Sequence, residues 1–356
     1  MKYFALMIFS SMILFDCDDN LTDCGSNDPP SGGGGNGGGT ARDSAIVLES
    51  SDGGRTWYNL YTIDEATSLD AVSGPATGGQ EFVVGGTDTA GNAILLTSHD
   101  AGFEWTRRYT GGPGSVDNLE AAGAHVFALT GSSLLRSTDF GVTWNEVASA
   151  PDLNGISFHG VTGFAIGGQG DLLRTTDFGE TWVNMPNPSV TPLFRSIANQ
   201  DNTVIAVGWG NPSIGGDFPV YYSFDTGMTW LPAAHSTGFC TIPNGEYHIE
   251  SVKFVDFDEA IFVTDGDFNN STSRTINSGA TWCGMSEPMS NTDNFRDIVT
   301  GEDHILIVGD EGIWWSENKG FDWEEAYTSD PGVELKAAFF PSFPLGYGVA
   351  VGVRHP

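Results

Sequence analysis

SSDGGRTW, residues 50–57, returns six more times along the chain as a recognisable eight-residue pattern. The pattern is Ser or Thr, any residue, Asp or Asn, any residue, Gly, any residue, Thr or an acid, and Trp. Seven of the ten tryptophans therefore occupy one position of one pattern. Its third and eighth positions are held by Asp52 and Trp57, Asp100 and Trp105, Asp139 and Trp144, Asp177 and Trp182, Asp225 and Trp230, Asn277 and Trp282, and Asn318 and Trp323.

Each copy has the chemistry of a hairpin turn that its own side chains close. The Asp or Asn oxygen and the Ser or Thr hydroxyl can accept hydrogen bonds from backbone N–H groups a few residues later. Glycine at the fifth position suits a positive φ, and the Trp starts the returning strand with a large ring to bury. An acid that recurs in every repeat serves the repeat, so we predict a structural and not a catalytic role for it.

The spacing of the pattern predicts the fold. Counted from Trp to Trp, the copies lie 48, 39, 38, 48, 52 and 41 residues apart, which is the period of a four-stranded propeller blade. The chain also ends with two apolar segments that lack a following hairpin, and the repeats begin with a hairpin that lacks two preceding strands. We therefore predict an all-β protein with a single seven-bladed β-propeller over residues 44–356, closed by strand exchange between the N- and C-termini. In the shared blade, residues 336–353 supply the inner two strands and residues 45 to about 61 the outer two.

The first 43 residues predict export. Residues 1–16 contain an apolar stretch that is too short to span a bilayer but suits a signal peptide. Cys17 follows at once and begins a disordered, Gly-rich tether, residues 17–43. This layout resembles a bacterial lipoprotein with its lipid on Cys17. Cleavage elsewhere by ordinary signal peptidase is the alternative, so the protein is expected either on a membrane through that lipid anchor alone or free in the periplasm or medium.

The charge of the chain restricts the kinds of partner that it can bind, and its cysteines indicate a disulfide. The net charge is -32, mainly because Lys and Arg together number only 14, and such a surface repels nucleic acid and anionic lipid headgroups. Cys240 and Cys283 are the two cysteines of the propeller, and in an exported protein they predict a disulfide. A loop of about 44 residues would be stabilised by roughly 4 kcal/mol. Cys24, in the tether, is left unpaired or reactive.

The boxed turns resemble the Asp-boxes of the bacterial neuraminidase repeat. The fuller repeat GISFHGVTGFAIGGQGDLLRTTDFGETW, residues 155–182, is most similar to the photosystem II stability and assembly factor family and its relatives in non-photosynthetic bacteria. That resemblance implies an exported seven-bladed propeller that acts as a non-catalytic protein-binding or assembly module at the cell envelope. Photosynthetic members use an Arg-rich surface for partner binding, whereas this chain has ten Arg and no run beyond Arg107-Arg108.

A glycoside hydrolase of sialidase-like type is the alternative function. The resemblance would then require an Arg triad, an early Arg-Ile-Pro phrase and a Tyr/Glu pair, and Arg-Ile-Pro is absent from the sequence. Xyloglucan-active endoglucanases of this repeat class need two tandem propellers, and this chain has one. We predict no catalytic residue, cofactor or metal site, because the seven His are scattered and the acid-rich residues 255–270 lack the order of a calcium loop.

The candidate binding residues come from the innermost strands. When these strands are aligned by their apolar residues, six polar residues fall at matching positions, where they would surround the mouth of the central channel. Two alternatives remain open: the charges pair with neighbouring acids such as Asp297, or they bind an anionic group such as a carboxylate or an acidic peptide terminus. The partner would be an envelope or extracellular protein or an anionic ligand, and we expect a monomer. The six residues are Arg195, Arg296, Lys336, Glu250, Asn154 and Asp70.

Overall fold

The computed structural model describes residues 42–75, 79–131, 133–149, 152–168, 171–188, 193–210, 219–235, 247–265, 272–285, 294–301, 304–340 and 347–356. The predicted signal peptide, Cys17, Cys24 and Cys240 lie outside these residues, so the lipid anchor and the disulfide stay predictions. Every regular element in the described ranges is a strand, and these ranges hold no helix that could cross a membrane. The strands belong to the compact unit Ala41–Pro356.

Five antiparallel sheets have four strands each. In three of them the strands pair in chain order, and the first of these contains β3 (Ala66–Ser73), β4 (Phe82–Asp88), β5 (Asn92–Ser98) and β6 (Thr106–Pro113). The second contains β7 (Val116–Ala122), β8 (His125–Thr130), β9 (Ser133–Ser137) and β10 (Asn145–Ser149). The third contains β11 (Leu153–His159), β12 (Thr162–Gly167), β13 (Leu172–Thr175) and β14 (Val183–Asn184). The fourth is β24 (Phe295–Thr300), β25 (Ile305–Gly309), β26 (Gly312–Ser316) and β27 (Glu324–Thr328). The fifth joins the two ends of the unit in the order β28 (Val333–Phe339), β29 (Gly348–Arg354), β1 (Ser44–Ser50) and β2 (Tyr58–Ile63).

The remaining sheet has nine strands. One antiparallel set is β15 (Leu193–Gln200), β16 (Thr203–Gly210), β17 (Val220–Ser223) and β18 (Leu231–Pro232); the other is β20 (Tyr247–Phe254), β21 (Ala260–Thr264), β22 (Thr272–Thr275) and β23 (Thr281–Gly284), with β19 (Ala234–His235) along β23. The sets join where Trp209 pairs with His248 and Gly210 with Tyr247. Five separate blades and a larger joined sheet therefore replace the expected seven separate blades, and the blade count is not confirmed.

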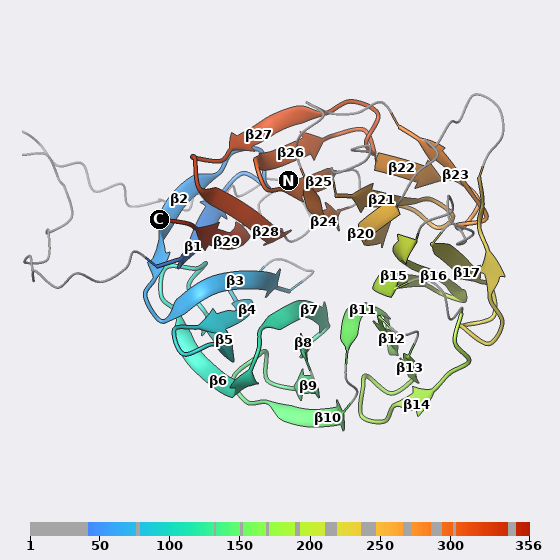
Figure 1. Cartoon of the computed structure of the whole chain (residues 1–356), viewed down its shortest axis with the longest axis horizontal. Coiled ribbons are helices and arrows are strands. Elements are labelled where there is room, and N and C mark those ends of the chain that lie inside the picture. The colour runs from blue at the N-terminus through green and yellow to red at the C-terminus, as the bar shows by residue number, and fades with distance from the viewer. Residues whose placement is uncertain are drawn as a thin grey trace, which may run out of the picture. The chain divides into compact units, whose positions relative to one another are not determined.

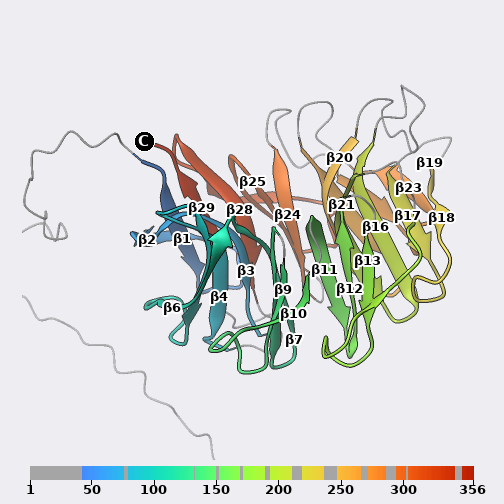
Figure 2. The same ribbon diagram turned by 60° about the horizontal axis from the view of Figure 1, so that its bottom comes forward.

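The sheets surround a common centre, as in a β-propeller. Figure 1 shows β3, β7, β11, β15, β20, β24 and β28 nearest the centre, with the later strands of each sheet farther out. Figure 2 shows the strands standing side by side along the axis of the ring. The predicted all-β propeller is therefore confirmed.

The ring closes through its two ends, as predicted. Strand β1 pairs with β29 from Ser44 opposite Arg354 to Ser50 opposite Gly348. The inner strands of this sheet come from the C-terminal end and the outer two from the N-terminal end. Closure pairs edges that would otherwise expose unsatisfied backbone groups.

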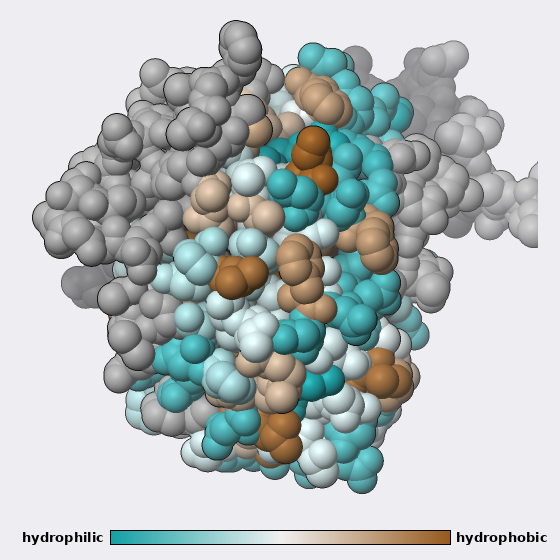
Figure 3. Space-filling view, turned by 90° about the vertical axis from the view of Figure 1, so that its right-hand side faces the viewer, coloured by the Kyte–Doolittle hydropathy of each residue, from teal (hydrophilic) through white to brown (hydrophobic). Residues whose placement is uncertain are grey.

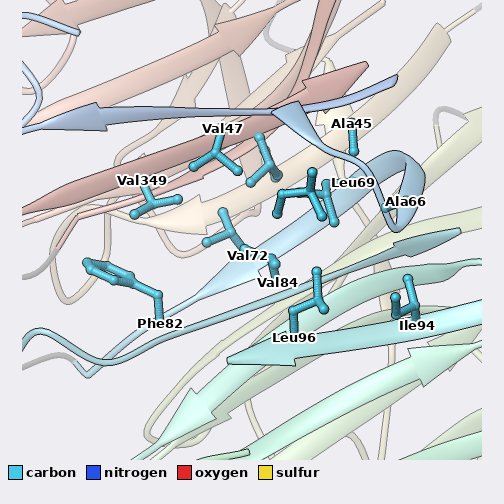
Figure 4. Packing of buried hydrophobic residues seen from close by; sticks show 13 residues of the cluster. Ala45, Val47, Ala66, Leu69, Val72, Phe82, Val84, Ile94, Leu96 and Val349 are labelled. Atoms are coloured by element: carbon cyan, nitrogen blue, oxygen red, sulfur yellow. The ribbon is translucent and has the colours of Figure 1, made fainter. Parts of the chain in front are cut away.

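Hydrophobic side chains fill the spaces between neighbouring sheets. In the cluster of Figure 4, Val47 of β1 and Val349 of β29 pack with Leu69, Phe82 and other residues of the next sheet, and these four are fully buried. Burying an aliphatic or aromatic side chain of this size contributes about 1.5–3 kcal/mol. Because each space draws on two sheets, the core depends on the ring being complete.

The boxed turns carry a repeated hydrogen-bond network. In the first box the Ser50 hydroxyl donates to Asp52 at 2.9 Å and accepts the Gly54 N–H at 2.8 Å, while Asp52 accepts the Thr56 N–H at 3.0 Å. The hydroxyl-to-carboxylate or hydroxyl-to-amide bond recurs in the other six boxes at 2.7–3.1 Å. The box glycine has a positive φ throughout, as predicted. The residue before it also has a positive φ, 55° to 65° where it is not glycine, which the pattern did not predict.

Candidate functional site

A β-bulge on each innermost strand creates the candidate site. In all seven strands the pairing with the second strand skips a residue that lines a central cavity of about 680 Å³, and β3 also skips a second residue, Thr67. A bulge bends the strand and changes the direction of a side chain, so the repeat places one residue per innermost strand at the cavity. We call these seven residues the mouth ring: Asp70, Asp117, Asn154, Arg195, Glu250, Arg296 and Lys336.

Six of the seven mouth-ring residues were identified from the sequence. The structure places all six together, and it adds Asp117 of β7. A signal for Asp117 was present, because VDNL at residues 116–119 has the same apolar-polar order as LDAV at residues 69–72.

The mouth ring lies at the opposite end of the propeller from the boxed turns. Four of its residues are the second or third residue of an innermost strand and the other three lie near mid-strand, whereas a box follows the end of the third strand of a sheet. Neighbouring strands run antiparallel, so the first and third strands run in the same direction and those two points are at opposite ends. Ligands that reach the mouth would therefore not touch the boxes.

Arg195 is the cation of the mouth ring that both an acid and an aromatic ring hold in place. Its Nη2 lies 3.1 Å from Oε2 of Glu250, and its guanidinium carbon lies 5.0 Å from the ring centroid of Trp209. The Trp209 indole N–H donates to the other oxygen of Glu250 at 2.9 Å, and its ring stacks on His248 at 4.9 Å. The Glu250 side chain is 6% exposed but that of Arg195 is 40% exposed. Arg195 is thus held by a buried acid and an aromatic face while part of it stays open to a ligand.

The other two cations of the ring also have acidic neighbours. Arg296 donates to both oxygens of Asp310, each at 2.8 Å, and Asn294 adds a bond to Asp310 at 2.9 Å. Burial acts to lower the pKa of Arg296, but the bonds to Asp310 raise that pKa above its ordinary value. Lys336 contacts Glu334 at 2.6 Å. These pairs fix the cations in place and reduce their net field.

All three cations pair with acids, which was one of the two alternatives from the sequence, but Asp297, the acid named there as an example, is not their partner. Its Oδ1 accepts the Ser251 hydroxyl at 3.2 Å and the N–H of Ile298 at 2.8 Å. Asp297 directly follows the bulge residue and also lines the cavity, and burial raises the pKa of its carboxyl.

The opposite side of the ring is acidic. Asp70 accepts the hydroxyls of Ser115 at 2.6 Å and of Ser68 at 3.0 Å. Burial, and next the negative charge of Asp70, raise the pKa of Asp117, while Arg195 acts in the opposite direction. The mouth thus has an acidic arc on β3 and β7 and cations on β15, β24 and β28.

Deeper in the cavity, an ion pair joins two distant strands. Lys253 of β20 lies 3.6 Å from Glu120 of β7, and this neighbour is the main cause of the raised pKa of Lys253. Neither residue was singled out from the sequence, because nothing local relates positions 133 residues apart. The two strands belong to separate sheets, so the pair connects opposite parts of the cavity wall.

The cavity wall combines acidic and basic side chains with little aromatic surface. Phe339 is the one aromatic residue among the described residues of that wall, and Trp209 lies beside the mouth against Arg195. The described residues also hold no group of three His, Cys, Asp or Glu side chains that could ligate a metal ion. Outside the channel, the side shown in Figure 3 carries hydrophobic residues as separate spots among hydrophilic ones.

The fold and the cavity define a β-propeller with a mixed-charge channel. No protein-family model and no curated protein matches the chain. Among solved structures, YCF48 from Cyanidioschyzon merolae is similar over 85% of this chain and 99% of its own, with 18% identity and a TM-score of 0.57. A structure of YCF48 bound to D1 peptide covers 82% of this chain and 92% of its own, with 17% identity and a TM-score of 0.57.

The same architecture also occurs in enzymes. The GH74 xyloglucanase from Xanthomonas campestris is 14% identical with a TM-score of 0.59, and the alignment covers 82% of this chain and 54% of that enzyme. Similarity at these identities shows the fold alone, and a fold does not determine a function. The residues of the cavity, and not the fold, therefore carry the information about function.

Proposed function

We propose that this protein is a non-catalytic β-propeller that binds a protein partner at the mouth ring and serves assembly at the cell envelope. The observation that supports it most is the repeated bulge, which brings one residue from each of seven strands to a single cavity. The structure of YCF48 with a D1 peptide supports a peptide as the kind of partner, because that propeller has the same fold.

A peptide carboxylate is the group that suits the basic side of the mouth. Arg195 is fixed by Glu250 and Trp209, so forming a bond to a ligand costs little additional side-chain entropy. Arg296 and Lys336 stand on the innermost strands that follow β20. The acids deeper in the cavity repel an anion, so the carboxylate would stay at the rim.

A peptide library with free C-terminal carboxylates, and the same library amidated, tests this proposal. We expect the protein to enrich acidic or free-carboxylate peptides, and the variant Arg195→Gln/Arg296→Gln to lose at least tenfold in affinity for them. Arg108→Gln, outside the cavity, is the matched control. Because Arg195→Gln leaves Glu250 without its cation, Arg195→Gln/Glu250→Gln separates lost binding from lost stability. Equal enrichment of amidated peptides would exclude recognition of the C-terminal carboxylate, and enrichment that ignores acidic side chains as well would exclude carboxylate recognition altogether.

Seven blades are part of the same proposal. The nine-stranded sheet contains two four-stranded sets that join through two residue pairs. A separate hydrophobic cluster lies between those sets, where Ile205, Val207 and Val220 meet Val252 and Phe262. These features favour an interpretation as two blades in contact at one end, and not as a single curled sheet.

Export and membrane attachment through Cys17 are also proposed, together with a Cys240–Cys283 disulfide and a monomeric state. Changing Cys17 to Ala should move the protein from the membrane to the soluble fraction, whereas a wild-type protein that is already soluble would exclude the lipid anchor. Thiol labelling of protein purified from the envelope should leave Cys283 unmodified unless reductant is added.

A further inference from the structure

The seam that closes the propeller contains a histidine bound on both sides. His355 follows β29, and its Nδ1 lies 3.0 Å from Oδ1 of Asp43 while its Nε2 lies 3.3 Å from Oε1 of Glu334. Asp43 directly precedes β1, and Glu334 belongs to β28. The His355 backbone N–H donates to the carbonyl of Gly332 at 2.7 Å, which fixes the chain at this point. One imidazole thus touches the start of the N-terminal strand and the innermost C-terminal strand.

Only a protonated imidazole satisfies both contacts. A neutral imidazole carries one N–H and one acceptor nitrogen, so it can donate to one carboxylate and would face the other with a lone pair. The hydrogen bond to Asp43 is the main cause of a raised pKa for His355, and the charges of Glu334 and Asp43 add to it. Two cations lie near the site: Lys336 contacts the other oxygen of Glu334 at 2.6 Å, and Arg354 lies 3.8 Å from Asp330. The stronger contact of His355, to Asp43, has neither of them as a partner.

We propose that His355 is a pH-sensitive latch on the closure of the propeller, tying the beginning of β1 to β28 through its two ring nitrogens. Because the folded-state pKa lies above the ordinary value of 6.5, the latch stabilises the closed ring fully below that pH. This stabilisation is lost as the pH rises through the raised value. The first pair of the seam, Ser44 with Arg354, lies beside the latch, so its release should loosen that end of β1 first.

A histidine NMR titration combined with thermal melts tests the latch on the full chain. We expect the His355 ring to titrate above 6.5, and His355→Asn to lower the melting temperature at pH 6 by about 1–2 °C but by much less at pH 9. Asp43→Asn should give the same pH-dependent loss, and the double variant should add little to either. His355 and Asp43 side chains are 40% and 49% exposed, so both variants should fold.

His99→Asn, an exposed histidine of the second box, is the matched control and should change the melting temperature equally at both pH values. Two results would overturn the latch. One is a His355 ring that titrates at or below 6.5; the other is a loss in His355→Asn that is the same at pH 6 and pH 9.

Discussion

At the scale of single residues, side-chain hydrogen bonds join the third and seventh positions of six boxes, whereas the second box has two acids there, Asp100 and Glu104. Where the third residue is Asp, a Thr hydroxyl usually donates to it, as Thr181 does to Asp177 at 2.6 Å. In the last box the third residue is Asn318, and its amide donates instead to Asp322 at 2.7 Å. A carboxylate at position 318 could not donate this bond and would bring a second negative charge close to Asp322.

Asn318→Asp should therefore destabilise the protein by about 1 kcal/mol, since a hydrogen bond is replaced by contact between like charges. Adding Asp322→Thr should restore stability, because the pair then matches the Asp–Thr pairs of four other boxes. Chemical denaturation measures both variants. No recovery in the double variant would show that the two positions are not coupled.

The box carboxylates also predict how stability depends on acid. Hydrogen bonds from Thr181 and Thr229 are the main cause of the low pKa values of Asp177 and Asp225, each about 2. A lowered folded-state pKa stabilises the protein above the unfolded value near 3.8, and that contribution is lost as the pH falls toward 2.

Asp177→Asn keeps the hydrogen-bonding geometry without the titration, as Asn277 does in its own box through bonds to Thr281. The unfolding free energy of this variant should therefore fall less steeply between pH 4 and pH 2 than that of the wild type. Denaturation curves at several pH values measure the slope, and an unchanged slope would contradict the assigned cause.

At the scale of elements, the features that recur in every repeat could be predicted from the sequence. The box hairpins, the strands around them and six mouth-ring residues follow from local order, because a fixed motif at a fixed period places equivalent residues equivalently. The acid partners could not be predicted in this way. Arg296 binds Asp310, which follows the next strand, and Lys253 reaches Glu120 across the cavity. Such contacts depend on side-chain reach and on distances between sheets, which local patterns do not encode.

The joining of two strand sets into one nine-stranded sheet could not be predicted from local patterns either. Pairing of Trp209 with His248 depends on two strand ends meeting in space. The two repeat periods between Trp182 and Trp282, 48 and 52 residues, are among the three longest, which indicates inserted segments but not that two strand edges would pair.

At the scale of the whole molecule, closure supports the hydrophobic clusters on both faces of the sheet that joins the two ends. Deleting residues 335–356 removes most of β28 and all of β29, so β1 loses its seven paired residues. Val47 and Leu48 would then lose the neighbours that bury them on this sheet. The truncated protein should fail to show a cooperative thermal transition by circular dichroism. A truncated protein that melts like the intact chain would exclude closure as a requirement for folding.

Site-specific photocrosslinking in the native host tests partner binding at the mouth most directly. A photoreactive residue at Asn154, a neutral member of the mouth ring, is compared with one at Phe103, an exposed box residue at the other end of the propeller. Binding at the mouth predicts a defined protein adduct from position 154, lost when Arg195 and Arg296 are changed to Gln, and no such adduct from position 103. An adduct from position 103 alone would contradict it.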